Sequence, residues 1–375
     1  MSNLWGQYFR VMTFGESHGI AVGCTIDGCP PGYKVDLQKI QLELDKRKPG
    51  QSSLTSPRQE EDRVECLSGL ENGVSLGTPL SFYVKNKDAN PKEYKQTALR
   101  PGHADTTTLE KYGLLALSGG GRASARETLA RVIAGSIACQ ILQQRYPQYL
   151  ATAYVQTVGQ IECQYPFDAQ WCQKDAKKIE NTPVRCPCHK HSTLMMEAIE
   201  KTKNDGDSLG GIIRCLVQGV PKGIGEPVFH KLQAVMAMAM MSIPATKGFE
   251  IGSGFSGTQL KGSEHNDPLG LDKNQNITPQ SNNAGGVQGG ISNGLPLDMR
   301  IAFKPTSTIQ KPQQSVDRNG QSTICPPHKG RHDPCVLPRA VPIVEAMAHL
   351  TIIDLWLQQQ IVINCRGSHN NFPQE

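Results

Sequence analysis

Residues 100–127 read RPGHADTTTLEKYGLLALSGGGRASARE and place His103 before three consecutive glycines, Gly119 to Gly121. The glycines lead into Arg122 and Arg126, where the sequence predicts the start of a helix. Glycine lets the backbone approach a ligand closely and adopts positive φ without steric cost. A helix start offers free N–H groups and a partial positive charge, and guanidinium groups suit phosphate. The stretch therefore predicts a phosphate-binding turn with a titratable imidazole beside it.

The segment 122–145 continues this stretch as a predicted helix. Apolar residues recur along it at helical spacing, from Leu129 through Val132 and Ile133 to Ile141, so one face is suited to a buried core. The preceding glycines lack the G-x-G-x-x-G pattern that follows a strand in dinucleotide-binding folds. The turn is therefore predicted to bind phosphate outside such a fold.

The rest of the chain predicts alternating strands and helices. Alternating apolar and polar residues indicate strands, and a spacing of three to four indicates helices. Three ranges lack both patterns: 51–63 and 252–294 are predicted loops, and 164–193 a variable surface region. The predicted strands are two within 4–30, then 64–70, 79–85, 152–163, 212–220 and 299–304; the further helices are 37–48, 228–241 and 338–359.

These elements are expected to form one domain. A chain of 375 residues is long enough for two or three domain-sized units. However, no tandem repeat and no Gly/Ser-rich or charged linker divides the sequence. We therefore expect a single domain over 1–363, followed by a polar, disordered tail over 364–375.

Composition limits the classes of function. The chain has 39 Lys and Arg against 34 Asp and Glu, a net charge of +5, without a basic block interleaved with aromatics. We therefore expect an anionic small-molecule ligand and no nucleic-acid partner. No secretory segment is visible, and no apolar run reaches the roughly 18 residues of a membrane helix. The twelve cysteines lack the spacing of a small disulfide scaffold, which favours reduced thiols in the cytoplasm. Because no apolar run is long enough, we also expect no membrane association.

The segment Cys186–His191, CPCHKH, contains the residue types of a zinc site. Structural zinc sites usually space paired cysteines by two to four residues. Here a single proline separates Cys186 from Cys188. The sequence therefore predicts a solvent-exposed loop, and no metal site is assigned.

Two histidines lie in short loops that contain glycine. His18 belongs to FGESHG, residues 14–19, between two predicted strands, where an imidazole can act as acid or base beside a cleft. An exposed turn histidine is the alternative interpretation. His103 follows a Pro-Gly pair, and Asp105, two residues later, is a candidate to orient a nearby histidine.

Several cationic side chains lie beside glycine or proline at the ends of predicted elements. Each one alone is more often a solvated surface group. Their recurrence at Gly/Pro-rich loops favours a ligand with more than one anionic group. The set comprises Arg47, Lys48, Arg100, Arg122, Arg126, Lys304, Arg331 and Arg339.

Asp354 lies on a mostly apolar stripe of the last predicted helix. Val344, Met347, Thr351 and Asp354 follow i, i+3, i+7, i+10 spacing. A buried carboxylate needs a partner or a raised pKa. Asp354 is therefore either a functional carboxylate or a residue at the edge of the stripe that pairs with an arginine.

Longer blocks of sequence resemble the chorismate synthase family, in family order and over nearly the whole chain. The blocks are FGESHG (14–19), RKPG (47–50), RPGHAD (100–105), GGGRASARET (119–128), GDSLGG (206–211), MSIPATKGFEIGSGF (241–255), GSEHND (262–267), NNAGGVQGGISNG (282–294), KPTSTI (304–309), GRHDPCV (330–336) and RAVPIVEAM (339–347).

The resemblance implies a fold, a reaction and partners. The family fold is α+β, with helices sandwiched between two mostly antiparallel sheets, and its members form homotetramers. The implied reaction is a 1,4-anti elimination of phosphate from 5-enolpyruvylshikimate 3-phosphate, which gives chorismate in the shikimate pathway of aromatic amino-acid biosynthesis. The reaction needs reduced FMN although it involves no net redox change.

The resemblance also implies roles for individual residues. His18 would act as acid toward the departing phosphate, His103 would protonate the reduced flavin, and Asp354 would help to remove the substrate's C6 proton. The residues that would hold the substrate's phosphate and carboxylates are Arg47, Arg126 and Arg339. The residues that would contact FMN are Arg122, Ala123, Ser124, Pro244, Ala245, Gly289, Lys304, Pro305, Thr306, Ser307, Thr308 and Arg331.

Two further points concern flavin reduction and the alternative function. Some family members reduce their own flavin with NAD(P)H, which Arg47 and a second arginine would contact; Ser53 stands at the second position here. Ser53 therefore disfavours flavin reduction by this chain, and two sources of reduced FMN stay open: an external flavin reductase, or NAD(P)H if the chain reduces its own flavin. The alternative is a non-catalytic FMN- or phosphate-binding protein on the same scaffold, which would not need proton donors such as His18 and His103.

Overall fold

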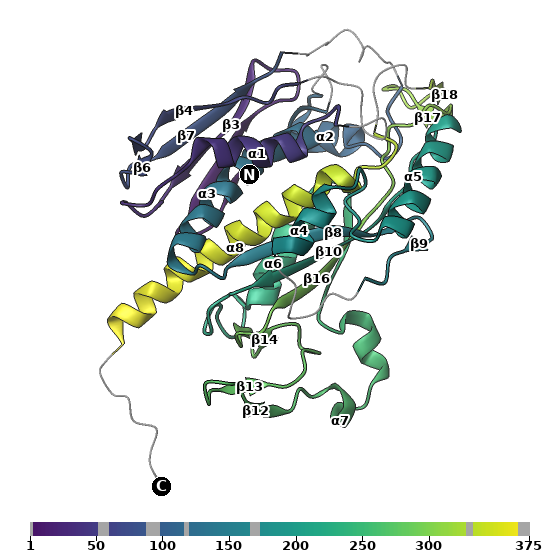
Figure 1. The fold of residues 1–375 in the computed structure, drawn as a ribbon. Helices are drawn as coiled ribbons and strands as arrows, with labels where there is room; N and C mark the ends of the chain where they lie inside the picture. The colour runs from purple at the N-terminus through teal and green to yellow at the C-terminus, as the bar shows by residue number, and fades with distance from the viewer. Residues whose placement is uncertain are drawn as a thin grey trace.

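The computed structural model describes residues 3–51, 60–87, 98–115, 120–165, 173–327 and 333–366. In this part of the chain two five-stranded antiparallel sheets enclose a layer of helices (Figure 1). The predicted α+β fold class, with helices between two antiparallel sheets, is confirmed.

The first sheet has the strand order β1-β2-β3-β7-β4 and holds the loop of His18. β2 and β3 form a hairpin in which Gly15 pairs with Val22. Gly15 has φ 89°, and a Cβ there would lie 2.1 Å from the Ala21 carbonyl oxygen, so only glycine fits where the loop begins. The strands are β1 (Leu4–Trp5), β2 (Arg10–Gly15), β3 (Ala21–Asp27), β4 (Val64–Ser68) and β7 (Leu80–Lys85).

The second sheet has the strand order β11-β16-β10-β8-β9. Its interior strand β16 buries alternate residues, Leu297, Met299, Ile301 and Phe303, because successive side chains of a strand point to opposite faces. The strands are β8 (Leu150–Val158), β9 (Ile161–Glu162), β10 (Gly211–Gln218), β11 (Thr246–Ile251) and β16 (Leu297–Phe303).

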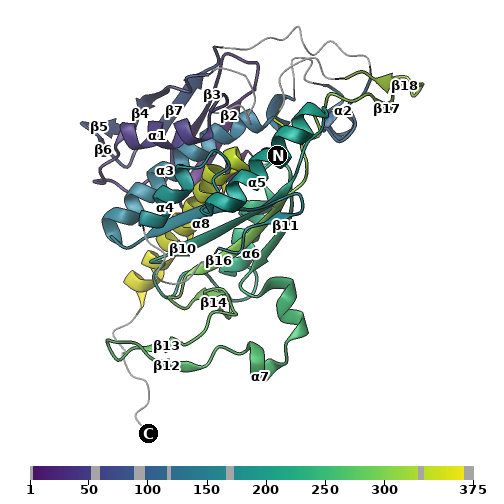
Figure 2. The ribbon, with the colours of Figure 1, turned by 45° about the vertical axis from the view of Figure 1, so that its right-hand side comes forward.

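The helical layer consists of α1 (Leu37–Arg47), α3 (Thr128–Arg145), α6 (Leu232–Met241) and α8 (Leu337–Cys365). α3 packs against the first sheet, α8 packs against the second, and the two helices pack against each other (Figure 2). They approach closely at Gly135, where an added Cβ would lie 2.5 Å from the Cβ of Ala346. A glycine on α3 therefore sets the distance between the two halves of the core.

The predicted helix 122–145 begins later than expected. Two short 3₁₀ turns, η2 (Gly121–Ala123) and η3 (Ala125–Glu127), precede α3, which starts at Thr128. Ser124 between the turns is extended, and its hydroxyl accepts a hydrogen bond from the Arg126 N–H. The expected helix start at Arg122 is therefore wrong, because the Ser124 side chain competes for the backbone.

Helix α8 differs from the predicted 338–359 at its carboxyl end and in its apolar character. It continues to Cys365, so the expected domain end at 363 lies inside the helix, and residues 367–375 of the predicted tail lie outside the described range. Its most apolar window has a mean hydropathy of 1.5, enough by length and composition to cross a membrane, but 89% of that window is buried. The expectation that no apolar run reaches the length of a membrane helix is therefore wrong. Because the window is mostly buried, α8 is a helix of the protein core.

The remaining elements lie outside the two five-stranded sheets and the helical layer. The predicted loop 252–294 contains several of them, and α5 was missed because polar residues dominate its first turn. These elements are β5 (Leu70–Glu71), β6 (Val74–Ser75), α2 (Asp105–Tyr112), α4 (Gln173–Glu180), α5 (His189–Asn204), η4 (Gly254–Gln259), α7 (Gly262–His265), β12 (Leu269–Leu271), β13 (Ile277–Pro279), β14 (Val287–Gln288), β15 (Ile291–Ser292), β17 (Gln313–Val316) and β18 (Ser322–Cys325).

Candidate active site

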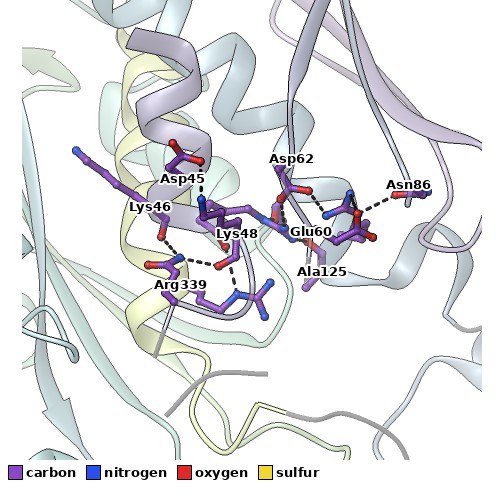
Figure 3. Close-up of polar contacts among 12 residues, drawn as sticks. Asp45, Lys46, Lys48, Glu60, Asp62, Asn86, Ala125 and Arg339 are labelled. Atoms are coloured by element: carbon purple, nitrogen blue, oxygen red, sulfur yellow. Dashed lines mark hydrogen bonds and ion pairs between the residues drawn. The ribbon is translucent and has the colours of Figure 1, made fainter. Parts of the chain in front are cut away.

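Three arginines from distant parts of the chain converge beside the start of α8 (Figure 3). Arg47 ends α1, Arg126 lies in η3, and Arg339 lies in the first turn of α8. Arg47 and Arg126 are only 2% and 4% exposed. Arg339 Nε donates a hydrogen bond to the Arg47 carbonyl oxygen at 3.2 Å. The structure thus brings together all three residues that were predicted to bind substrate.

Carboxylates compensate the charge of this cluster. Asp62 Oδ1 accepts a hydrogen bond from Arg126 Nη1 at 2.5 Å, and Asp62 Oδ2 lies 3.6 Å from Arg47 Nη1. Glu60 Oε2 lies 3.7 Å from Arg126 Nη2. Burial, and then the positive charges of Arg339 and Arg126, lower the pKa of Arg47 to about 9. Burial therefore disfavours the charged form of Arg47 most, and the carboxylates of Asp62 and Asp333 oppose this effect.

Asn86 connects the arginine cluster to the His18 loop. Its Oδ1 accepts a hydrogen bond from Arg126 Nε at 2.9 Å, while its Nδ2 donates to the carbonyl oxygens of Glu16 and Gly19 at 3.1 and 2.7 Å. His18 itself is half-buried and its Nδ1 lies 2.8 Å from the hydroxyl of Ser17. One amide side chain thus holds the predicted general acid next to a predicted substrate ligand.

A cavity of about 370 Å³ lies on the other side of the cluster. Ala125, whose carbonyl oxygen accepts a hydrogen bond from Arg47 Nη2, is part of its wall. The volume is within the range of small-molecule sites, roughly 300–1,000 Å³. Among the residues that line it are Gly102, His103, Gly120, Ala123, Ala125, Pro244, Ala245, Lys304, Thr306, Ser307, Asp333 and Val336.

His103 is held in one orientation at this cavity. Its Nδ1 lies 3.0 Å from the Pro101 carbonyl oxygen, and its Nε2 lies 3.0 Å from the hydroxyl of Thr308. A carbonyl oxygen only accepts, so Nδ1 carries a proton. Burial and the nearby charge of Arg100 lower the pKa of His103. In the neutral ring, Nε2 is therefore the acceptor of the Thr308 hydroxyl.

Lys304 brings a cation to the same wall. Its Nζ donates hydrogen bonds to the Gly102 carbonyl oxygen at 3.1 Å and to the Ser307 hydroxyl at 2.6 Å. Across the described residues no carboxylate forms an ion pair with Lys304. A cation with neutral partners at a cavity can compensate the charge of an anionic ligand. The expected contacts Ala123, Pro244, Ala245, Lys304, Thr306 and Ser307 all line this cavity, and Thr308 adjoins it through His103.

Asp333 is a site residue that sequence reasoning missed. It lines the cavity, and its Oδ2 lies 2.5 Å from Nη1 of Arg339. Its carbonyl oxygen accepts a hydrogen bond from the hydroxyl of Thr306 at 2.8 Å. Asp333 therefore joins the cavity to the arginine cluster. The signal was present in the segment GRHDPCV, from which only Arg331, outside the described residues, was selected.

Asp354 lies elsewhere. Its Oδ1 accepts hydrogen bonds from the backbone N–H groups of Gln7, Tyr8 and Phe9 at 2.7 to 2.9 Å, and its side chain is buried. Fifteen residues of α8 separate it from Arg339, which corresponds to about 22 Å at the helical rise. The partners of Asp354 are therefore backbone groups rather than the arginine that one interpretation expected, and the carboxylate anchors the amino-terminal segment.

The remaining predicted cofactor contacts are not at the cavity wall. Arg122 donates hydrogen bonds to the Gly15 and Thr13 carbonyl oxygens at 3.0 and 3.1 Å, so its guanidinium is part of the first sheet's support. Gly289 directly follows β14 and is not among the residues that line the cavity. Ser124 and Pro305 adjoin lining residues in the chain without lining the cavity themselves.

Comparison with known proteins decides the family. The chorismate synthase family model matches residues 9–357. The chain belongs to the chorismate synthase family. The chorismate synthase of Synechococcus sp. strain RCC307 is 53% identical over 96% of this chain and 99% of its own length. That of Prochlorococcus marinus strain AS9601 is 54% identical over 94% and 96%.

A solved structure shares the fold over nearly the full length. The crystal structure of a chorismate synthase matches this chain with a TM-score of 0.76 and 28% identity, over 95% of this chain and 93% of the other. The chorismate synthase fold therefore includes both sheets and the helical layer. The resemblance seen in the sequence blocks is confirmed.

Proposed function

We propose that this chain converts 5-enolpyruvylshikimate 3-phosphate into chorismate and phosphate, in the shikimate pathway, at the arginine cluster and the adjoining cavity. The observation that carries the proposal is the convergence of Arg47, Arg126 and Arg339 beside a cavity that contains His103. The substrate has one phosphate and two carboxylates. Guanidinium groups form forked hydrogen bonds with both kinds of anion, which suits three converging arginines to this substrate.

The carboxylates of Glu60 and Asp62 hold the guanidinium groups in place before substrate binds. Buried arginines without such partners would be costly, because an unpaired buried charge loses its hydration. The two carboxylates engage Arg126 from one side. A substrate anion would then approach preoriented donors, which lowers the conformational cost of binding.

The cavity fits reduced FMN as the cofactor. Lys304 offers a cation without a carboxylate partner in the described chain, and Thr306 and Ser307 offer hydroxyls beside it. Gly102, Gly120 and Ala123 keep the wall open to a planar ring. Ala123, Pro244, Ala245, Lys304, Thr306 and Ser307 would hold the cofactor. When bound, reduced FMN supplies electron density to the substrate transiently and recovers it as phosphate leaves.

Two imidazoles manage the protons. Asn86 links the loop that contains His18 to Arg126, and on this basis we assign His18 as the group that donates a proton to the phosphate. His103 keeps a proton on Nδ1, and its Nε2 is the atom that exchanges a proton at the cavity. An anionic cofactor in the cavity would raise the pKa of His103 and so favour protonation of Nε2.

The carboxylate for proton removal is Asp333 rather than Asp354. Asp333 lines the cavity, whereas Asp354 is engaged by three backbone N–H groups about 22 Å from Arg339. The ion pair of Asp333 with Arg339 holds the carboxylate next to a proposed substrate ligand.

An external reductase supplies the reduced flavin. Ser53 stands where flavin-reducing members of the family carry a second arginine, which disfavours reduction of the flavin by NAD(P)H at this site. The position of Ser53 lies outside the described residues. A homotetramer in the cytoplasm remains the expectation from the sequence.

An anaerobic assay tests the proposal. Protein loaded with chemically reduced FMN is mixed with the phosphorylated enol ether, and chorismate and phosphate are measured. Release of both in equal amounts supports the lyase. Flavin binding without product would identify the alternative, a non-catalytic flavin-binding protein on the same scaffold. NAD(P)H and oxidised FMN, supplied without a reductase, are expected to give little product.

A further inference from the structure

Three cysteines and a histidine form a cluster far from the arginine site in the sequence. Cys163 follows β9, Cys186 and Cys188 lie on the segment that leads into α5, and His191 lies in the first turn of α5. The ligand atoms of Cys163, Cys188 and His191 all lie within 4.8 Å of one another. The Cys163 and Cys186 thiols are hydrogen bonded to each other, so Cys186 adds a fourth possible ligand beside this group of three.

We propose that Cys163, Cys186, Cys188 and His191 bind a structural zinc ion. Zinc in structural sites is tetrahedral, with Zn–S distances of about 2.3 Å, which places ligand sulfurs roughly 3.8 Å apart. Distances of up to 4.8 Å within the group require only small side-chain movements to reach that geometry. Thiolate and imidazole donors favour zinc over the oxygen-preferring cations.

The backbone around the cluster is already fixed. Cys163 and Cys186 are 1% and 0% exposed. The Cys163 N–H donates to the Gln156 carbonyl oxygen at 2.8 Å, and the Cys186 N–H donates to the Thr182 hydroxyl at 2.9 Å. The prediction of a solvent-exposed loop is therefore wrong for Cys186. The third sulfur comes from β9, so the spacing within CPCHKH could not reveal it.

The electrostatic setting favours thiolates. Cys188 is the N-cap of α5, a helix of 16 residues, whose amino terminus carries a partial positive charge. His191 Nδ1 lies 3.0 Å from the Cys188 sulfur. Metal binding would displace the remaining protons to solvent.

A metal accounts for the cluster better than a disulfide does. A disulfide would use two sulfurs, would leave the third sulfur and the imidazole without a role, and would need an oxidant. A Cys₃His set uses all four groups and is a known structural zinc combination. The cysteines of the cluster are free thiols in the structure.

The proposed zinc site supports the arginine cluster through Arg185. The Arg185 guanidinium donates hydrogen bonds to the carbonyl oxygens of Lys46, at 2.8 Å, and Pro338. Each acceptor immediately precedes a cluster arginine, Arg47 or Arg339. Because Arg185 is adjacent to Cys186, a metal ion bound by Cys186 would fix the position of Arg185. This consequence rests on the proposed function, whereas metal binding itself does not.

Metal analysis of the whole purified chain tests the site. Protein purified without chelators should contain about one zinc ion per chain by elemental mass spectrometry. We expect the zinc content to fall at least about tenfold in each of three variants, because each one lacks one of the four proposed ligands. The variants are Cys163→Ser, Cys188→Ser and His191→Ala. Cys66→Ser, a change at another partly exposed free cysteine, should leave it unchanged.

A spectroscopic titration keeps the proposal testable if the variants do not fold. Wild-type protein stripped with a chelator and titrated with Co²⁺ should develop the sulfur-to-cobalt charge-transfer absorption and visible bands of a tetrahedral thiolate site. Zinc-free protein without cobalt bands would overturn the proposal. So would a Cys163–Cys186 or Cys163–Cys188 disulfide in peptide maps of protein kept under reducing cytoplasm-like conditions. Neither readout depends on turnover, so failure of the lyase assay would be seen separately.

Discussion

Arg126 Nη1 lies 2.5 Å from Asp62 Oδ1, and the two side chains are 4% and 0% exposed. The same carboxylate approaches Arg47. One aspartate therefore compensates two buried guanidinium groups, and it does so in a part of the protein where water cannot replace it.

Removal of that charge should destabilise the free protein. We expect Asp62→Asn to lower the free energy of unfolding by about 3–5 kcal/mol, because it leaves buried guanidinium charge uncompensated. Added inorganic phosphate should raise the free energy of unfolding of Asp62→Asn more than it raises that of the wild type. Asp27→Asn, which breaks an exposed pair with Arg10, should cost under about 1 kcal/mol. Equal effects of the two substitutions in urea unfolding would refute the proposed role of Asp62.

The protonation of His103 should depend on the ligand. Its pKa is lowered in the free protein, so the folded state favours the neutral ring. The stabilisation from this group is present above the unfolded pKa, near 6.5, and is lost as pH falls below it. NMR titration of the His103 ring should give a midpoint below about 6.5, and a higher one when reduced FMN is bound. An unchanged or lower midpoint in the complex would contradict the proposed proton exchange at Nε2.

The contact between α3 and α8 should tolerate no side chain at Gly135. A Cβ there would lie 2.5 Å from Ala346 Cβ, so Gly135→Ala should destabilise the fold by about 1–3 kcal/mol or more through overpacking. Gly262→Ala is the matched control, since an added Cβ there meets nothing within 4 Å. Thermal unfolding of both variants measures the difference. A neutral Gly135→Ala would show that the helices separate easily.

Loss of either imidazole should slow the reaction. We expect His18→Ala and His103→Ala each to reduce turnover by roughly 10²–10⁴, the usual contribution of a general acid or base, with flavin affinity largely kept. His189→Ala, a change at an exposed histidine, should keep the wild-type rate. Wild-type rates in both active-site variants would exclude the proposed proton roles.

The fold could be predicted because its core depends on local periodicity. The apolar stripes of 122–145 and 338–359 locate α3 and α8, and the alternation in 299–304 locates β16. The start of α3 could not be predicted, since Ser124 interrupts the helix with its own hydrogen bond. α5 was missed because its first turn, His189–His191, is polar.

The site could be predicted only in part, because several of its contacts join residues far apart in the sequence. The pattern of cations near glycine and proline gave a set of eight, and the resemblance to the chorismate synthase family selected Arg47, Arg126 and Arg339 from it. Asn86, which links Arg126 to the His18 loop, carries no motif. A carboxylate on an apolar stripe implies a partner but not its identity, and the partners of Asp354 are backbone groups more than 340 residues away in sequence.

The matched pair Asp333→Asn and Asp354→Asn tests the location of the active site most directly. Turnover of both variants is measured anaerobically with chemically reduced FMN, beside a thermal unfolding scan. We expect Asp333→Asn to lose roughly 10²–10⁴ in turnover while it still binds flavin. Asp354→Asn should keep its turnover per folded molecule and lose about 1.5–3 kcal/mol of stability, because its charged acceptor is gone. A folded Asp354→Asn without activity, beside an active Asp333→Asn, would contradict the proposed site.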